Sequence, residues 1–138
     1  MIVADTNLIS YLLIDGEKTD LARKVWTIDP KWAMPPLWRS EFLSVLVVAV
    51  RAGALKEEQA QILLRRSQVF MSAVEVEPDG ERVFKLAVER NISAYDAQFI
   101  AVAEELEAPL VTADKRIIAN CPDLAVSLET FVSDKSHE

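Results

Sequence analysis

The sequence opens with IVADTNLISYL over residues 2–12, and this stretch decides the fold. Residues 2–4 are apolar and form a short run of the kind that makes a buried strand. Polar residues interrupt the run at Asp5, and from Leu8 the apolar residues return at the spacing of a helix. A carboxylate therefore stands where the first strand passes into the first helix, and its position needs an explanation.

The rest of the chain continues this alternation of apolar runs and helical patterns. We expect further strands over residues 32–34, 73–77, 110–112 and 125–126, and helices over residues 7–14, 20–28, 37–52, 56–72, 81–90 and 95–106. Alternating strands and helices predict an α/β fold, in which helices flank both faces of a mostly parallel central sheet. The functional crevice of such a fold lies beyond the carboxyl ends of the strands. Asp5 and Asp114 both fall there.

The composition is that of one folded domain. The chain has 138 residues, of which 51% are hydrophobic and 27% charged, so we expect a single domain over residues 1–132 and a disordered polar tail over residues 133–138. Cys121 is the only cysteine, which excludes an internal disulfide and fits a reducing cytoplasm. No signal-peptide pattern is present, and the longest apolar stretch, residues 42–50, is far shorter than the about 20 residues of a membrane span. We therefore expect a cytoplasmic protein without a membrane segment.

Four acidic residues stand at predicted element ends, and each has an ordinary structural role available. Asp5 and Asp114 are placed to cap the helices that follow them. Asp96 fits the third position of a capping box that begins at Ser93. Glu41 lies near a helix start, where the helix dipole favours an acid. Taken singly, none of the four requires a function.

The faces of the helices favour a second interpretation. Glu41 shares its helix face with Trp38 and Val45, and Asp96 lies beside Phe99 by the same spacing. An acid on an apolar edge is costly unless its charge is cancelled. If the four acids meet, each pair at about 4 Å repels by about 4 kcal/mol at an effective dielectric constant of about 20. A divalent cation relieves this repulsion, and a donor set made only of oxygen favours Mg²⁺ or Mn²⁺ over Zn²⁺.

Four motifs now resemble, in order, those of the PIN-domain nucleases and in particular the VapC-like toxins of toxin–antitoxin pairs. They are VADTN (3–7), WRSEF (38–42), SAYDAQFIAVAEEL (93–106) and LVTADKR (110–116). The resemblance covers the chain from residue 2 to about residue 131, and the third motif followed closely by TAD is its most specific part. It implies a PIN-like α/β/α sandwich and a metal-dependent endoribonuclease that hydrolyses RNA phosphodiesters.

The resemblance also assigns roles to individual residues. It implies that the catalytic and metal-binding acids are Asp5, Glu41, Asp96 and Asp114, and that Thr6, Asn7 and Thr112 are the supporting polar residues. Some related nucleases carry a further acid shortly after the last motif, where this chain has residues 117–119, Ile-Ile-Ala. The resemblance therefore leaves open whether one or two Mg²⁺ or Mn²⁺ ions bind. For Thr112, filling a β-strand is an equally good explanation.

The net charge of −7 argues against a nucleic-acid-binding protein, since such domains are usually basic. Two divalent ions would offset four of these negative charges, and acids that bind metal do not count against RNA binding. Arg39, Lys115 and Arg116 lie close in sequence to the predicted acids, so we expect them to contact RNA phosphates. The alternative for each is a solvated position on the surface.

The helix predicted over residues 37–52 is apolar almost all round, which indicates that something beyond its own domain covers it. The resemblance implies two partners, a second copy of the chain in a homodimer and a cognate antitoxin. It further implies that an antitoxin segment lies across the protein and brings a basic side chain to the acids.

Two other functions remain open. IVADTN is similar to part of the first motif of Mg²⁺-dependent phosphohydrolases with an aspartyl nucleophile, but Asn7 stands where their second Asp is expected. The second alternative is a non-catalytic protein-interaction module, in which the acids only cap helices. Cleavage of RNA that depends on a divalent ion distinguishes the nuclease from both.

Overall fold

A parallel sheet lies at the centre of the computed structural model, which describes residues 1–71 and 74–136. Within those residues the sheet has four strands, in the order β2 (Trp32–Ala33), β1 (Ile2–Ala4), β3 (Leu110–Thr112) and β4 (Ala125–Ser127). Each neighbouring pair of these strands runs parallel, and Val3 lies level with Ala33 on one side and Leu110 on the other. The predicted α/β fold with a mostly parallel sheet is confirmed.

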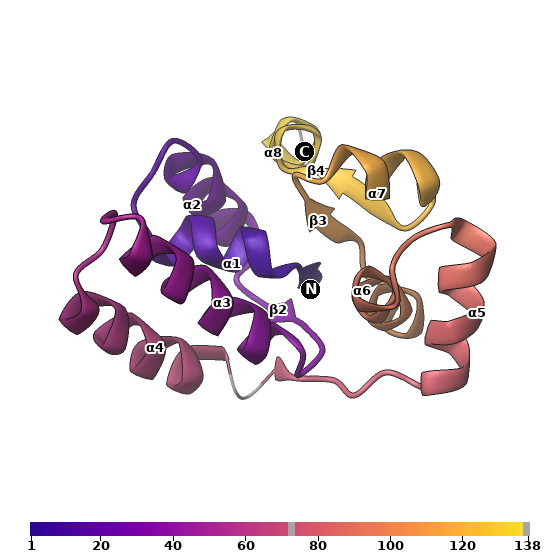
Figure 1. Ribbon diagram of the computed structural model, residues 1–138. Coiled ribbons are helices and arrows are strands. Elements are labelled where there is room, and N and C mark those ends of the chain that lie inside the picture. Colours follow the sequence, from indigo (N-terminus) through magenta and orange to yellow (C-terminus); the bar gives the residue numbers. More distant parts are fainter. Residues whose placement is uncertain (72–73, 137–138) are drawn as a thin grey trace.

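Helices connect the strands and pack around them. In the described residues they are α1 (Thr6–Leu13), α2 (Thr19–Ile28), α3 (Trp38–Arg51), α4 (Glu57–Met71), α5 (Gly80–Arg90), α6 (Ala94–Leu106), α7 (Lys115–Asn120) and α8 (Leu128–Ser136). Figure 1 shows α1 to α4 on one side of the strands and α5 and α6 on the other. None of the helices in residues 1–71 and 74–136 combines the length and apolar composition that a membrane span needs.

The two central strands decide where polar groups gather. β1 and β3 are buried along their whole length, as expected of parallel strands that are covered on both faces. They run in the same direction, so their carboxyl ends lie side by side. β1 leads through one residue, Asp5, into α1, and β3 leads through Ala113 and Asp114 into α7. Asp5 and Asp114 are therefore brought to the same edge of the sheet.

The strand predicted over residues 73–77 is shorter in the structure, and its first residue, Ala73, lies outside the described residues. What remains is an isolated parallel bridge between Met34 and Glu75. The amide of Met34 donates to the carbonyl of Val74, and the amide of Val76 donates to the carbonyl of Met34. This segment extends the sheet only locally, beyond the end of β2, because Pro78 cannot donate a further backbone hydrogen bond.

The C-terminal end is more regular than predicted. The tail expected to be disordered from residue 133 is helical as far as Ser136, where α8 ends, so the prediction is wrong for residues 133–136; residues 137–138 lie outside the described residues. Leu128 and Phe131 are buried and anchor the first turns of α8. Once these turns have formed, each further residue adds a backbone hydrogen bond at little cost, even where the side chains are polar.

Candidate metal centre

A cavity of about 350 Å³ opens at the carboxyl ends of β1 and β3. The residues that line it come from β3 and from four helices or the caps that precede them. They include six of the residues predicted for the site, namely Asp5, Thr6, Asn7, Glu41, Asp96 and Asp114. The structure thus brings together all four acids. The seventh predicted residue, Thr112, does not line the cavity but is joined to it by its hydrogen bond to Asp5.

Asp5 is the most deeply buried of the four acids, with a relative exposure of 8%. It is the N-cap of α1, and its Oδ1 accepts a hydrogen bond from the amide of Leu8 at 2.8 Å. Its Oδ2 accepts a hydrogen bond from the hydroxyl of Thr112 at 2.5 Å. Each carboxylate oxygen keeps a further lone pair, so both remain able to bind a cation.

Burial raises the pKa of Asp5 from 3.8 to about 6, because the charged carboxylate has lost most of its hydration. The hydrogen bonds from Thr112 and Leu8 act in the opposite direction but do not cancel the effect. The negative charges of Asp114 and Glu41 raise the pKa further. Without a cation, the site therefore disfavours the ionised form of its central acid.

Glu41 reaches the cavity from the first turn of α3. Its Oε1 accepts a hydrogen bond from the hydroxyl of Thr6 at 2.7 Å, which joins α3 to the start of α1. Burial raises the pKa of Glu41, the hydrogen bond from Thr6 lowers it, and the charge of Asp96 raises it again. Thr6 therefore orients one of the four acids.

Asp96 and Asp114 face the cavity from two other helix starts. Ser93 caps α6 by accepting a hydrogen bond from the amide of Asp96 at 3.0 Å. Asp114 caps α7, where its Oδ1 accepts hydrogen bonds from the amides of Arg116 and Ile117 at 2.9 and 3.1 Å. Burial is the main cause that raises the pKa of Asp96, and the charge of Asp114 adds to it.

Mutual repulsion links the four acids into a ring. The charges of Asp114 and Glu41 raise the pKa of Asp5. The charge of Asp96 raises the pKa of Glu41, and that of Asp114 raises the pKa of Asp96. Asp5 and Asp114 do cap helices. This role does not exclude a functional cluster, because the helix starts that they cap lie around one cavity.

The donor set fits a hard divalent cation. The acids lining the cavity offer carboxylate oxygens, with hydroxyl and amide groups of Thr6 and Asn7 beside them, and these are the ligands that Mg²⁺ and Mn²⁺ prefer. Among residues 1–71 and 74–136, no three His, Cys, Asp or Glu side chains already stand close enough to share one ion. The acids surround the cavity rather than meeting at one point, so binding an ion requires them to turn inward.

The three basic residues predicted to contact RNA phosphates do not line the cavity. Arg39 is held by Glu75, whose Oε1 accepts a hydrogen bond from its Nε at 2.5 Å. Arg116 donates a hydrogen bond to the carbonyl of Asn91 at 3.3 Å, although its charge still lowers the pKa of Asp96 against the stronger effect of burial. Lys115 is exposed at the start of α7.

Five residues of the cavity wall were not predicted as site residues, namely Ser44, Val45, Phe99, Leu110 and Ile117. Ser44, Phe99 and Ile117 each lie three positions after one of the acids and share its helix face. Their spacing of three residues from an acid on the same helix was enough to predict these three as cavity residues. Ser44 supplies a hydroxyl, whereas the other four are apolar.

Comparison with known proteins agrees with this geometry. A family model described as the PIN domain matches residues 2–121. Ribonuclease VapC3 from Pyrobaculum aerophilum is 26% identical over 126 residues, which cover 89% of this chain and 96% of that protein.

Solved structures share the fold. The crystal structure of PAE2754 from Pyrobaculum aerophilum matches with a TM-score of 0.76 at 23% identity, over 99% of this chain and 97% of that one. A toxin–antitoxin complex from Klebsiella pneumoniae matches with a TM-score of 0.66 at 21% identity, over 93% and 98% of the two chains. Since the family model spans most of the sequence, from the first strand to the end of α7, the chain belongs to the PIN domain family.

Proposed function

We propose that this protein is an endoribonuclease that hydrolyses RNA phosphodiesters with the help of Mg²⁺ or Mn²⁺, and that it is the toxin of a toxin–antitoxin pair. The observation that carries the proposal is the ring of four acids, from four different helix starts, around one cavity of a PIN domain. The name of the relative Ribonuclease VapC3 supports RNA as the substrate. One or two ions would bind.

Asp5 and Asp96 would be the central ligands of the ion, and Glu41 and Asp114 would complete the site directly or through water. The ion, when bound, would supply an activated water and offset the charge that develops on the leaving oxygen. The chain itself keeps the ligands oriented. Thr112 holds Asp5 by a hydrogen bond, and Thr6 holds Glu41 in the same way.

The other residues that line the cavity include both polar and apolar side chains. Asn7 and Ser44 line it with an amide and a hydroxyl that can hydrogen-bond the substrate near the ion. Phe99 and Ile117 present carbon atoms to the cavity instead, and these would limit the access of water to the ion. No histidine or cysteine lines the cavity among the described residues, so no side chain is placed there as a strong nucleophile.

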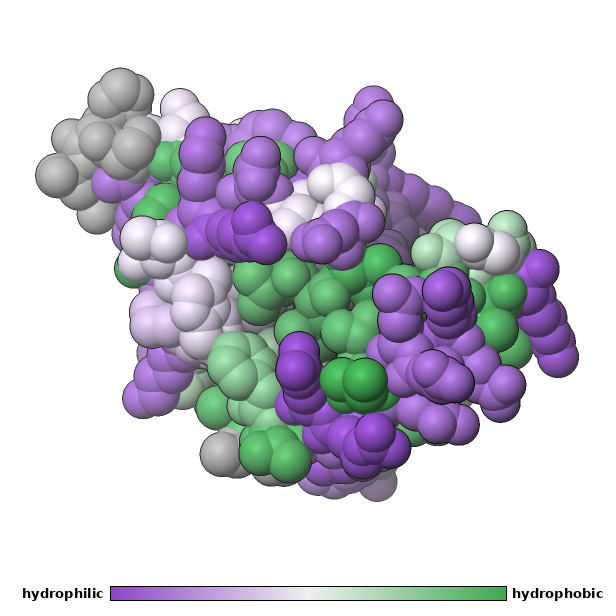
Figure 2. Space-filling view, turned by 90° about the vertical axis from the view of Figure 1, so that its left-hand side faces the viewer, coloured by the Kyte–Doolittle hydropathy of each residue, from purple (hydrophilic) through white to green (hydrophobic). Residues whose placement is uncertain are grey.

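A groove on the side formed by α1 to α4 is suited to an antitoxin segment, and its lining is partly apolar and partly polar, with Asp15 and Gln59 among the polar residues. Leu13 and Ile14 at the end of α1 face Ile62 and Leu63 of α4 around a cavity of about 460 Å³, with Arg66 at its edge. Figure 2 views this side and shows apolar side chains gathered in a hollow between polar ridges. An antitoxin segment with apolar and acidic residues would complement it, and the complex from Klebsiella pneumoniae supports a partner of this class.

The outer face of α3 supports the predicted homodimer. Leu43 and Val47 are exposed there and line an apolar cavity of about 280 Å³ between α3 and α4. Exposed apolar surface of this kind is typical of a protein interface. Cys121 is buried as a free thiol, which fits a protein that works in the reducing cytoplasm.

Asp96→Asn provides the test. The purified wild-type protein should cleave a labelled RNA in Mg²⁺ or Mn²⁺ and not in chelator, and Asp96→Asn should abolish cleavage while retaining the fold. Glu105→Gln removes the same charge from an exposed position of α6 and should cleave normally. Cleavage at the wild-type rate by folded Asp96→Asn would contradict the proposal. Release of phosphate from a small phosphomonoester, without RNA cleavage, would instead indicate a phosphohydrolase.

A further inference from the structure

A lysine lies over a tyrosine ring at the corner where α1 passes into α2. The Nζ atom of Lys18 lies 5.7 Å from the centre of the Tyr11 ring. It also lies 4.0 Å from Oε1 of Glu129 at the start of α8, which is the outer limit of an ion pair. We call these three residues the corner cluster.

The turn that carries Lys18 is braced by hydrogen bonds. The hydroxyl of Thr19 accepts a hydrogen bond from the amide of Gly16 at 2.9 Å and donates one to the carbonyl of Ile14 at 3.1 Å. Thr19 is itself buried. Because the turn is closed in this way, the backbone at Lys18 is placed so that its side chain extends back over Tyr11.

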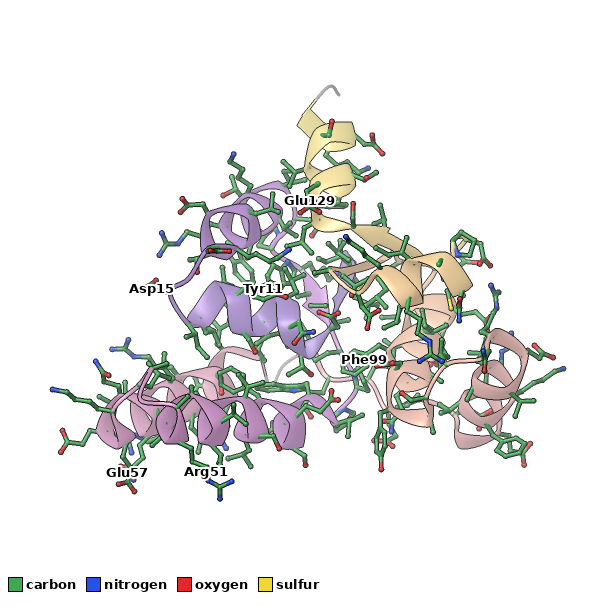
Figure 3. The ribbon with its side chains drawn as sticks, turned by 45° about the horizontal axis from the view of Figure 1, so that its top comes forward. Tyr11, Asp15, Arg51, Glu57, Phe99 and Glu129 are labelled. Atoms are coloured by element: carbon green, nitrogen blue, oxygen red, sulfur yellow. The ribbon has the colours of Figure 1, made fainter. Side chains whose placement is uncertain are left out.

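The corner cluster continues the polar edge of the cavity. Asn7 lines the cavity, and Tyr11 lies one helical turn further along the same face of α1. The charge of Asp5 is close enough to act on the phenol: burial, Asp5 and Glu129, in this order, raise the pKa of Tyr11, so its hydroxyl remains a hydrogen-bond donor at neutral pH. Figure 3 shows Tyr11 on α1, with Glu129 above it and Phe99, which lines the cavity, beyond the other end of the helix.

The cavity lacks the positive side chains that an RNA backbone needs. Within the described part of the chain, no lysine or arginine lines it. Arg39, whose position in the sequence suggested a phosphate contact, is held by Glu75 at 2.5 Å. Lys18 differs, because its distance from Glu129 is long and Glu129 is largely exposed, so a stronger anion can replace this pairing.

We propose that Lys18 and the hydroxyl of Tyr11 bind a backbone phosphate of the RNA, next to the phosphate that is cleaved. This inference rests on the proposed ribonuclease function and extends it to the path of the substrate. Tyr11 lies six residues after Asp5, about 9 Å along the helix, so the substrate strand would leave the cavity along α1. An extended single strand can follow this path because its backbone is not tied to a partner strand.

Binding can be measured without cleavage in protein that carries Asp96→Asn. The probe is a short fluorescein-labelled oligouridylate in millimolar Mn²⁺, and its dissociation constant is followed by fluorescence anisotropy over a series of salt concentrations. Adding Lys18→Gln should weaken binding and reduce the slope of log K against log salt by about 0.7, the value for one phosphate contact on a single strand. Adding Tyr11→Phe should weaken binding about threefold, the effect of one hydrogen bond. Adding Glu129→Gln should tighten binding, since it removes the competing carboxylate.

Lys24→Gln is the matched control, because it removes the same charge from an exposed position of α2, the helix that Lys18 precedes. It should change affinity less than Lys18→Gln does. Equal losses for the two lysine variants, unchanged binding in Lys18→Gln, or no binding by the Asp96→Asn parent would each overturn the inference. Normal RNA cleavage by the wild type in those cases would leave the ribonuclease function standing. Binding that depends on Lys18 in a protein that cleaves no RNA would support the phosphate site and contradict the nuclease.

Discussion

The hydroxyl of Thr112 donates a hydrogen bond to Oδ2 of Asp5 at 2.5 Å and so joins two strand ends that lie 107 positions apart in the sequence. The hydroxyl oxygen of Thr112 also accepts a hydrogen bond from the amide of Asp114 at 3.0 Å. One hydroxyl therefore orients the central acid and braces the turn that carries another. Thr112 is completely buried, so water cannot take its place.

Thr112→Val keeps nearly the same side-chain shape but leaves a buried carboxylate oxygen of Asp5 and the half-buried amide of Asp114 without this partner. It should therefore destabilise the protein by about 1–3 kcal/mol. Thr112→Ser keeps the hydroxyl and should lose less. The free energy of unfolding in urea, measured in chelator, checks both. Equal free energies of unfolding for Thr112→Val and Thr112→Ser would mean that Thr112 only fills the strand. This is the alternative that the sequence left open.

The sequence was sufficient to predict which acids line one cavity. Asp5 and Asp114 follow strands that had to be parallel, so their place at one edge of the sheet followed from topology. Glu41 and Asp96 were recognisable as acids on apolar helix faces. Both predictions depend on short-range patterns, which a single sequence records well.

Contacts between distant segments were not predictable in the same way. Glu75 holds Arg39 across 36 positions, and no periodicity links the two. The corner cluster joins α1, α2 and α8, so its members are brought together only by the packing of the helices. The capping roles of Asp5 and Asp114 were predicted as alternatives to the cluster, whereas the structure shows that one side chain serves as a cap and also lines the cavity.

The metal-free protein should lose stability as pH rises through the range in which Asp5 ionises. Its pKa is about 6 in the folded protein and about 3.8 in an exposed chain, so between these values the folded state holds a proton that the unfolded state releases. The stabilisation is present in full below pH of about 4 and is lost above about 6, a change of about 3 kcal/mol.

Asp5→Asn isolates this effect, since the other acids remain. Unfolding in urea, in chelator and over a pH series, should show the variant gaining on the wild type by up to about 3 kcal/mol as pH rises. A constant difference between the two proteins across the series would mean that Asp5 has an ordinary pKa.

Val47→Glu should weaken association without unfolding the domain. Val47 is 43% exposed in the single chain, so a carboxylate there stays hydrated until a partner covers it. We expect about a tenfold or greater loss in self-association or in antitoxin affinity, measured by light scattering over a concentration series and by titration with the antitoxin. Val88→Glu makes the same change at an exposed position of α5 and is the control. Unchanged mass together with unchanged antitoxin affinity in Val47→Glu would show that this face of α3 is not an interface.

Asp5→Asn should also separate a helix cap from a metal ligand. Asn caps a helix about as well as Asp, so a residue that only caps would tolerate the change with little effect on stability. In the ring of acids, removing one charge relieves repulsion, and the variant should melt at a higher temperature than the wild type in chelator. It also loses a ligand, and therefore should gain less stability from the ion.

Four melts measure both effects, with wild type and Asp5→Asn each heated in chelator and in millimolar Mn²⁺. For the wild type, free ion at about ten times its dissociation constant adds about 1.4 kcal/mol if only the folded state binds it. For a domain of this size that is a rise of about 5 °C in the melting temperature. If Asp5 belongs to the ring of four acids, two results are expected together. The variant should have the higher melting temperature in chelator, and it should gain less when Mn²⁺ is added. Equal gains in both proteins would leave Asp5 with the role of a helix cap alone.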